Sequence, residues 1–291
     1  MFDNFTSHSI IVNEAEIFLR CAGDGPPLVL LHGYPQSHLC WRHVAPALAQ
    51  EFSVIVPDLR GYGESRGPEP DVAHLGYSKR AMAGDIVAVM AELGFAEFAL
   101  AGHDRGGRVA YRLALDHPER LTKVSFLDMI PTLEMAERTD KGLALATYHW
   151  FFLAQPAPLP ERLIGAEPDF YIDWTIRSWL ARDFEMEPEV MQAYCRNFHQ
   201  PSVIQAACED YRAGMSADLE HDAADRQAGR RITCPVQTLW GENRAKGRAN
   251  DPVEIWRRWA NDVRGRPLDC GHFLPEEKPD EVISELREFF T

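Results

Sequence analysis

Short, uninterrupted runs of apolar residues recur near both ends of the chain. Runs of this kind are typical of strands buried on both faces of a parallel sheet. Helical patterns lie between them: residues 78–93 carry one apolar face, Ser78 can cap the start, and Gly94 is placed to end the helix. This alternation predicts an α/β fold with a mostly parallel sheet. We expect strands over residues 8–13, 15–21, 28–31, 53–56, 97–101, 124–127, 236–241 and 268–270, and helices over residues 41–50, 78–93, 106–117, 252–261 and 276–290.

The middle of the chain has a different pattern. Strand-like runs are missing from residues 132–226, aromatic residues are dense, and prolines at positions 156, 158 and 160 interrupt the segment. We interpret it as a helical cap inserted into a core of residues 1–131 and 227–291. Active sites of such sheets lie at the carboxyl ends of the strands. The residues that directly follow the expected strands are therefore the first candidates for chemistry.

Composition and charge narrow the range of functions. The 291 residues carry a net charge of −14, which disfavours a nucleic-acid surface and means that a small anionic substrate must be captured by local arginines. The six cysteines lack C-x-x-C spacing and predict reduced thiols. No secretory signal or apolar run of membrane length is recognisable. We expect a cytoplasmic protein that binds neither nucleic acid nor membrane.

A Gly-x-Asp-x-Gly motif at residues 102–106 follows an expected strand and precedes an expected helix. This spacing is typical of a nucleophile elbow, a sharp turn whose neighbouring residues must be small. Asp104 stands at the nucleophile's position, where serine is usual, and a carboxylate there predicts attack on an sp³ carbon. The alternative, an aspartate that only caps the helix, is disfavoured by the accompanying sequences at 32–35 and 271–272.

His272 follows the last expected strand, which predicts the general base in the order nucleophile, acid, histidine. Three residues compete for the role of its acidic partner. Asp128 ends the strand after the elbow and is favoured. Glu242 and Asp251, which come after the following strand, are the rivals.

Two arginines, Arg105 and Arg108, lie on the first turn of the helix that follows the candidate nucleophile. A guanidinium group binds carboxylates through paired hydrogen bonds, so these residues indicate a substrate that is itself a carboxylate, although surface arginines are usually only solvated. The backbone N–H groups of Arg105 and Tyr34 are expected to form an oxyanion hole.

Three residues of the insertion, His149, Trp150 and Tyr211, carry hydrogen-bond donors. Converging donors would stabilise a leaving halide. From the residues alone, ordinary aromatic packing of a lid is the preferred interpretation.

Beyond these individual motifs, the chain resembles the haloacetate (fluoroacetate) dehalogenases of the α/β-hydrolase fold over nearly its whole length. The segments that carry the resemblance are residues 32–36, 102–109, 127–128, 148–150, 153–161, 208–214 and 271–277. The resemblance implies a mostly parallel eight-stranded sheet flanked by helices, a helical cap and a homodimer. It also implies site roles: nucleophile Asp104, base His272 with Asp128, carboxylate-binding Arg105 and Arg108, halide-binding His149, Trp150 and Tyr211, and the pocket residue Trp179.

The expected reaction is hydrolytic dehalogenation of a small haloacid, fluoroacetate or chloroacetate, to glycolate and halide through an Asp104 ester, with no metal or organic cofactor. An epoxide hydrolase is the alternative, since it shares the elbow aspartate and the histidine but needs two lid tyrosines. The insertion offers Tyr148, Tyr171, Tyr194 and Tyr211. A non-catalytic ligand receptor on the same fold is the third interpretation. The sequence leaves open whether fluoride is cleaved and whether longer 2-halo acids fit.

Overall fold

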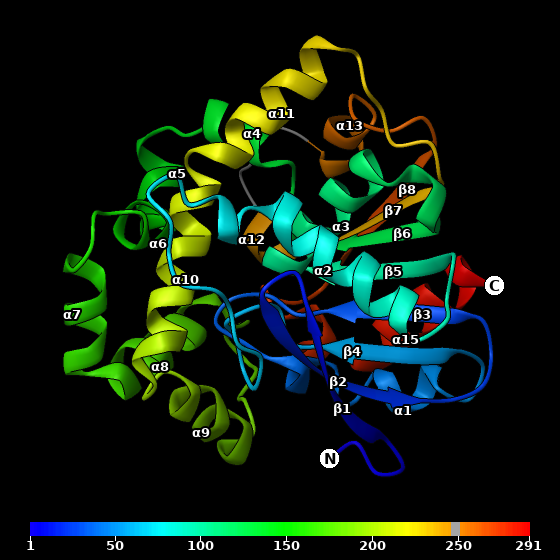
Figure 1. Ribbon diagram of the computed structural model, residues 1–291, viewed down its shortest axis with the longest axis horizontal. Helices are drawn as coiled ribbons and strands as arrows, with labels where there is room; N and C mark the ends of the chain where they lie inside the picture. The colour runs from blue at the N-terminus through cyan, green and yellow to red at the C-terminus, as the bar shows by residue number, and fades with distance from the viewer. Residues whose placement is uncertain (246–250) are drawn as a thin grey trace.

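One eight-stranded sheet organises the protein, whose computed structural model describes residues 1–245 and 251–291 (Figure 1). The strand order is β1-β2-β4-β3-β5-β6-β7-β8. The pairs β1–β2 and β2–β4 are antiparallel, and the other neighbours are parallel. The mostly parallel sheet and the hairpin at its start are therefore confirmed. The strands are β1 (Thr6–Val12), β2 (Ala15–Ala22), β3 (Pro27–Leu31), β4 (Ser53–Pro57), β5 (Phe98–His103), β6 (Leu121–Leu127), β7 (Val236–Gly241) and β8 (Val263–Leu268).

The central strands send alternate side chains into two hydrophobic cores, one on each face of the sheet. In β3, Val29 and Leu31 belong to one core, and Leu28 and Leu30 belong to the other. The first core includes α2 (Lys79–Glu92) and α3 (Arg105–Asp116), and the second includes α1 (Ala45–Leu48) and α15 (Pro279–Phe290). Because both faces are covered, every position of such a strand needs an apolar side chain, which explains the uninterrupted runs.

Helix α2 begins and ends where the sequence predicts. The Ser78 side chain accepts a hydrogen bond from the Ala81 N–H at 3.2 Å, which caps the first turn. Gly94 follows the helix with φ at +84°, a left-handed conformation that favours glycine.

Several other helix bounds differ from the expected ones, and proline explains two of them. The segment 41–50 forms a 3₁₀ turn (His38–Trp41) and the short α1, because Pro46 cannot donate the hydrogen bond that a continuous helix needs. The segment 276–290 is divided into α14 (Leu274–Glu277) and α15, which starts with Pro279. Helix α13 (Pro252–Trp256) stops before residue 261, because Ala260 forms a β-bridge with Ile232.

The last strand was placed wrongly at residues 268–270. Strand β8 precedes that position and has mostly exposed side chains, because it lies at the edge of the sheet. Its sequence is polar and contains Pro267, which an edge strand tolerates. No apolar run therefore marked it.

Between β6 and β7 the chain forms helices only, as predicted for a helical insertion. Helices α5 to α10 lie together to the left of the sheet in Figure 1. The insertion comprises α4 (Thr132–Glu137), α5 (Lys141–Ala146), α6 (Tyr148–Leu153), α7 (Leu159–Ala166), α8 (Pro168–Trp179), α9 (Pro188–Asn197), α10 (Pro201–Gly214) and α11 (Ala217–Gln227). The remaining elements are α12 (Glu242–Ala245) and 3₁₀ turns at Leu75–Tyr77 and Pro118–Arg120. Among all helices of the described ranges, none combines the length and the apolar character that a membrane span requires.

Leu30 lies in the fully buried part of β3, so its truncation tests the two-core arrangement. We expect Leu30→Ala to lower the free energy of unfolding by about 2–5 kcal/mol, because it leaves a cavity in a packed core. The control is Ile11→Ala in β1, whose side chain is 82% exposed and whose change should stay within about 0.5 kcal/mol. Equal losses in chemical denaturation would contradict the assignment of these two positions.

Candidate active site

Asp104 lies in a strained turn between β5 and α3. Its φ of 47° and ψ of −112° fall outside the regions that non-glycine residues ordinarily adopt. A Cβ atom on Gly102 would lie 2.5 Å from the Gly106 carbonyl oxygen, and one on Gly106 would lie 2.4 Å from that of His32. The two glycines are therefore required by close backbone approach, as the elbow motif predicts.

His272 stands between two carboxylates. Its Nδ1–H donates to Asp128 Oδ2 at 2.5 Å, and its Nε2 lies 3.7 Å from Asp104 Oδ2. The other Asp128 oxygen accepts the Gly241 N–H at 3.0 Å, which fixes this carboxylate at the ends of β6 and β7. The three residues expected to form a triad thus come together at the carboxyl ends of the strands.

The two rival acids do not reach His272. The Asp251 side chain caps α13 and accepts the Val253 N–H at 2.8 Å. Glu242 is an exposed residue of α12. The acidic partner of His272 in the structure is therefore Asp128, and not Glu242 or Asp251.

The surroundings keep Asp104 ionised. Burial alone would raise the pKa of its carboxyl group, but His272, His103 and the Arg105 guanidinium hold that pKa well below its usual range. Asp104 Oδ1 also accepts the Tyr34 N–H at 3.0 Å. A carboxylate that stays negative and partly desolvated is a suitable nucleophile.

Both groups of the expected oxyanion hole lie at the elbow. The Tyr34 N–H already contacts the Asp104 carboxylate. Arg105 is the first residue of α3, so its N–H has no acceptor within the helix. The Tyr34 N–H thus lies beside the Asp104 carboxyl group, and the Arg105 N–H directly follows the nucleophile in the chain.

Arg105 is completely buried and binds Asp210 of α10. Its Nε donates to Asp210 Oδ2 at 2.8 Å, and its Nη2 donates to Oδ1 at 2.6 Å and to the Asp210 carbonyl at 2.8 Å. Within the described part of the chain, Nη1 is the one nitrogen of this guanidinium without a hydrogen bond. The Nε–Nη2 edge of this guanidinium is thus occupied by Asp210. The sequence analysis expected Arg105 to bind a substrate carboxylate through two parallel hydrogen bonds, and this edge cannot supply them.

Asp210 holds more than Arg105. Its carboxylate also accepts hydrogen bonds from Lys79 Nζ and, at 2.8 Å, from the Tyr62 hydroxyl. Burial would raise the pKa of Asp210, yet Arg105 and Lys79 lower it to about 2. Burial and the neighbouring Arg105 also lower the pKa of Lys79. Asp210 therefore binds two buried cations, and it shares Lys79 with Asp218, whose Oδ2 lies 3.4 Å from Lys79 Nζ.

Arg108, the second arginine of the elbow helix, has no carboxylate partner within the described residues. Its Nη1 donates to the Ile130 carbonyl and to Thr132 Oγ1, both at 3.0 Å, and its Nε has no hydrogen bond. In the described ranges, no carboxylate lies within ion-pairing distance of this side chain, which is only 4% exposed. Burial and Arg105 lower its pKa, so a negative charge placed beside it would be strongly favoured.

The aromatic residues of the insertion gather over the elbow. The Tyr211 ring lies 5.7 Å from the ring of His149 and 5.4 Å from that of Trp150. Trp179 stands 4.4 Å from His149 and 5.4 Å from His272, centroid to centroid. The Tyr211 hydroxyl is buried and has no hydrogen-bond partner among the residues that the structure describes. The four predicted residues of the insertion therefore form one cluster next to the triad.

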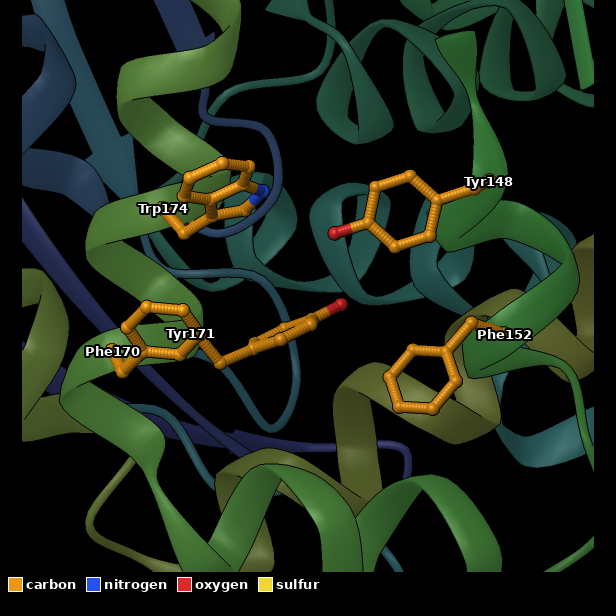
Figure 2. Close-up of a pocket in the computed structure, with 5 residues that line it drawn as sticks. All are labelled: Tyr148, Phe152, Phe170, Tyr171 and Trp174. Atoms are coloured by element: carbon orange, nitrogen blue, oxygen red, sulfur yellow. The ribbon is translucent and has the colours of Figure 1, made fainter. Parts of the chain in front are cut away.

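Two cavities differ in their relation to this cluster. A small one of about 70 Å³ is lined by Trp150 and by the Arg108 partner Thr132, among others. A larger, open hollow of about 340 Å³ lies between α6 and α8 and is lined only by aromatic residues (Figure 2). Its lining includes Tyr148 and Tyr171, two of the tyrosines considered for an epoxide, but none of the residues predicted for the haloacid site.

The sequence analysis missed the residues that support the site. Asp210 stands directly before Tyr211, and Glu277 lies in the segment 271–277, but neither had an assigned role. Asp210 pairs with Arg105, which is 105 residues away, and Glu277 binds backbone N–H groups, so residue spacing carried no signal for either. Among the described residues, no cluster of three His, Cys, Asp or Glu side chains is arranged to hold a metal ion.

Comparison with known proteins gives one consistent family. The α/β hydrolase fold family matches residues 26–279. The chain is 40% identical to a fluoroacetate dehalogenase of Burkholderia sp., covering 100% of this chain and 95% of that one, and 36% identical to a soluble epoxide hydrolase of Corynebacterium sp. strain C12, covering 100% and 99%. The crystal structure of ALR0039 from Nostoc sp. PCC 7120, described as an α/β hydrolase, superposes with a TM-score of 0.97 at 50% identity, covering 100% and 99%.

Removal of the Asp210 charge should destabilise the protein. We expect Asp210→Asn to lower the free energy of unfolding by about 3–5 kcal/mol, because the buried Arg105 loses its carboxylate partner and Lys79 keeps only Asp218. Asp173 provides the control, because it forms an exposed ion pair with Arg177 one helical turn away. Asp173→Asn should lower the free energy of unfolding by less than about 1 kcal/mol. Similar costs in urea denaturation would argue against the buried network.

The same variant should show a defined pH dependence. The folded-state pKa of Asp210 is depressed from 3.8 to about 2, so its stabilisation is present above pH 3.8 and is lost as the pH falls through that window. The difference in unfolding free energy between wild type and Asp210→Asn should be constant near about pH 5 and should become smaller as the pH falls towards about pH 2. A constant difference would contradict the depressed pKa.

Proposed function

The chain belongs to the α/β-hydrolase fold family, and from that premise we propose that it hydrolyses the carbon–halogen bond of small haloacids, with haloacetates as the substrates. The observation that carries this proposal is the buried, unbalanced charge of Arg108. A haloacid brings a carboxylate that would neutralise it, and a neutral epoxide or haloalkane does not. Arg108 Nε and Arg105 Nη1, both buried and without hydrogen bonds, supply one donor each.

In the first step, Asp104 attacks the α-carbon of the haloacid in line with the carbon–halogen bond. A carbon–oxygen bond forms, and the halide leaves with the bonding electron pair. His149, Trp150 and the unpartnered Tyr211 hydroxyl are the donors proposed to hold the leaving halide. Such stabilisation matters most for fluoride, the poorest leaving group.

In the second step, His272 removes a proton from water through Nε2, and the hydroxide adds to the ester carbonyl of Asp104. Asp128 fixes the imidazole with its Nδ1–H bound, which leaves Nε2 as the base. The N–H groups of Tyr34 and Arg105 would stabilise the oxyanion. Collapse breaks the ester bond, His272 protonates the departing glycolate oxygen, and the regenerated Asp104 carboxyl group releases a proton.

Epoxide hydrolysis is the second candidate, because one similar protein is a soluble epoxide hydrolase and the Tyr211 hydroxyl could bind an epoxide oxygen. That reaction needs a second tyrosine that faces the same oxygen. The hydroxyl of Tyr148 points into the outer hollow (Figure 2). That of Tyr171 accepts a hydrogen bond from the Tyr34 hydroxyl at 3.4 Å, and that of Tyr194 donates to Glu276 at 3.1 Å. Tyr148 and Tyr194 are thus directed elsewhere, and the buried charge of Arg108 favours the haloacid over an epoxide.

A comparison of charged and neutral substrates tests the role of Arg108. We expect the wild-type protein to release halide from chloroacetate much faster than from chloroacetamide or 1-chlorobutane. It should also convert chloroacetate much faster than it converts styrene oxide to the diol. In Arg108→Met, kcat/KM for chloroacetate should fall roughly 10- to 100-fold, because a charge-assisted hydrogen bond is lost, while chloroacetamide changes little. The control is Arg177→Met on exposed α8, which should match wild type.

Two results would overturn the proposal. Turnover of styrene oxide or chlorobutane but not of the acids would assign the site to neutral substrates. Ligand binding without turnover, unchanged by Asp104→Asn, would indicate a receptor.

Isotope labelling tests the ester intermediate. A single turnover of chloroacetate in ¹⁸O-water should place the label in the Asp104 carboxylate, because water attacks the carbonyl of the enzyme ester. Mass spectrometry of the peptide that contains Asp104 measures it. Label found only in glycolate would mean that water attacks the substrate directly.

A further inference from the structure

We infer that Glu277 is a positioning residue for His272, and that its carboxylate fixes the loop that carries the imidazole. The inference rests on the proposed role of His272 in ester hydrolysis. It concerns a residue that touches neither substrate nor reacting atoms and that acts only through the backbone around the histidine.

The Glu277 carboxylate accepts backbone hydrogen bonds on both sides of His272. Its Oε2 accepts the Gly271 N–H at 2.7 Å, and its Oε1 accepts the Phe273 N–H at 2.8 Å. Oε2 also accepts the N–H of Ala181, in the cap, at 2.9 Å. One side chain therefore binds the backbone on both sides of His272 and links this loop to the insertion.

The backbone of His272 itself is also held. Its N–H donates to the Trp179 carbonyl at 3.0 Å, and its own carbonyl accepts Nε2–H of His103 at 2.7 Å. With the Glu277 bonds, the N–H groups of residues 271, 272 and 273 and the carbonyl of His272 are bound to fixed partners. The chain between β8 and α14 has no ladder or helix to supply such bonds, so side chains and the cap provide them.

The partners of the buried Glu277 carboxylate support a role in fixing the backbone. The side chain is buried, yet in the described structure its three partners are all N–H groups and no basic side chain pairs with it. A buried carboxylate without a cation is costly unless several donors bind it. Three convergent donors make it a rigid anchor.

The consequence lies in the geometry of one catalytic step. His272 must keep its 2.5 Å contact with Asp128 while Nε2 faces the water that hydrolyses the ester. Displacement of a reacting group by about 1 Å can cost on the order of 100-fold in rate. Formation of the ester by Asp104 does not use the imidazole, so the loss should be confined to the second step.

Glu277→Gln tests this, because it keeps the size of the side chain but turns one acceptor oxygen into an N–H donor facing the same backbone. With chloroacetate we expect kcat to fall about 10- to 100-fold with little change in the rate of the first halide release. The ester should accumulate, detected as a carboxymethyl group on the Asp104 peptide by rapid quench and mass spectrometry. Asp280→Asn, an exposed carboxylate nearby in α15, is the matched control and should behave as wild type.

A second readout needs no substrate. The Nδ1–H proton between His272 and Asp128 should give a low-field NMR signal in wild type and Asp280→Asn, and this signal should be lost or broadened in Glu277→Gln and in the shorter Glu277→Asp. An unchanged signal, or equal slowing of both chemical steps together with a lowered melting temperature, would overturn the inference. If wild type releases no halide, the proposed substrate is wrong, whereas the NMR comparison still decides the role of Glu277.

Discussion

The ion pair between Arg105 and Asp210 is the contact on which the site depends most. It joins the first turn of the elbow helix to α10 in the cap, completely out of solvent. Lys79 and Tyr62 bind the same carboxylate, so α2 and the loop after β4 are tied to it as well. A buried pair of this kind adds little net stability but imposes one arrangement of its parts. Here it fixes the cap over the triad and brings Tyr211 with it.

Much of the core of this architecture could be predicted from sequence, because its causes are local. Strands covered on both faces need apolar side chains throughout, which made β3 to β7 recognisable. The elbow depends on close approach at Gly102 and Gly106, and that requirement is visible as spacing. The order of Asp104, Asp128 and His272 along the chain follows from the strand ends, and the structure brings these side chains together.

The parts that could not be predicted from sequence depend on edge position, on contacts between distant segments or on bonds to backbone groups. Strand β8 is an edge strand with exposed side chains, so no apolar pattern distinguished it from a loop. The occupied edge of Arg105 follows from Asp210, 105 residues away. Glu277 gave no signal either, because its partners are backbone groups, which every residue possesses.

The unbalanced Arg108 has a consequence for ligand discrimination. While the site holds only water, the fold bears the cost of this desolvated cation, and any small carboxylate that enters relieves it. Acetate, glycolate and haloacetates should thus all raise the melting temperature by mass action. Affinity then separates acids from neutral molecules but hardly separates one small acid from another. The choice among acids is left to the carbon that faces Asp104, because only a carbon with a leaving group can react, and glycolate is expected to inhibit its own formation.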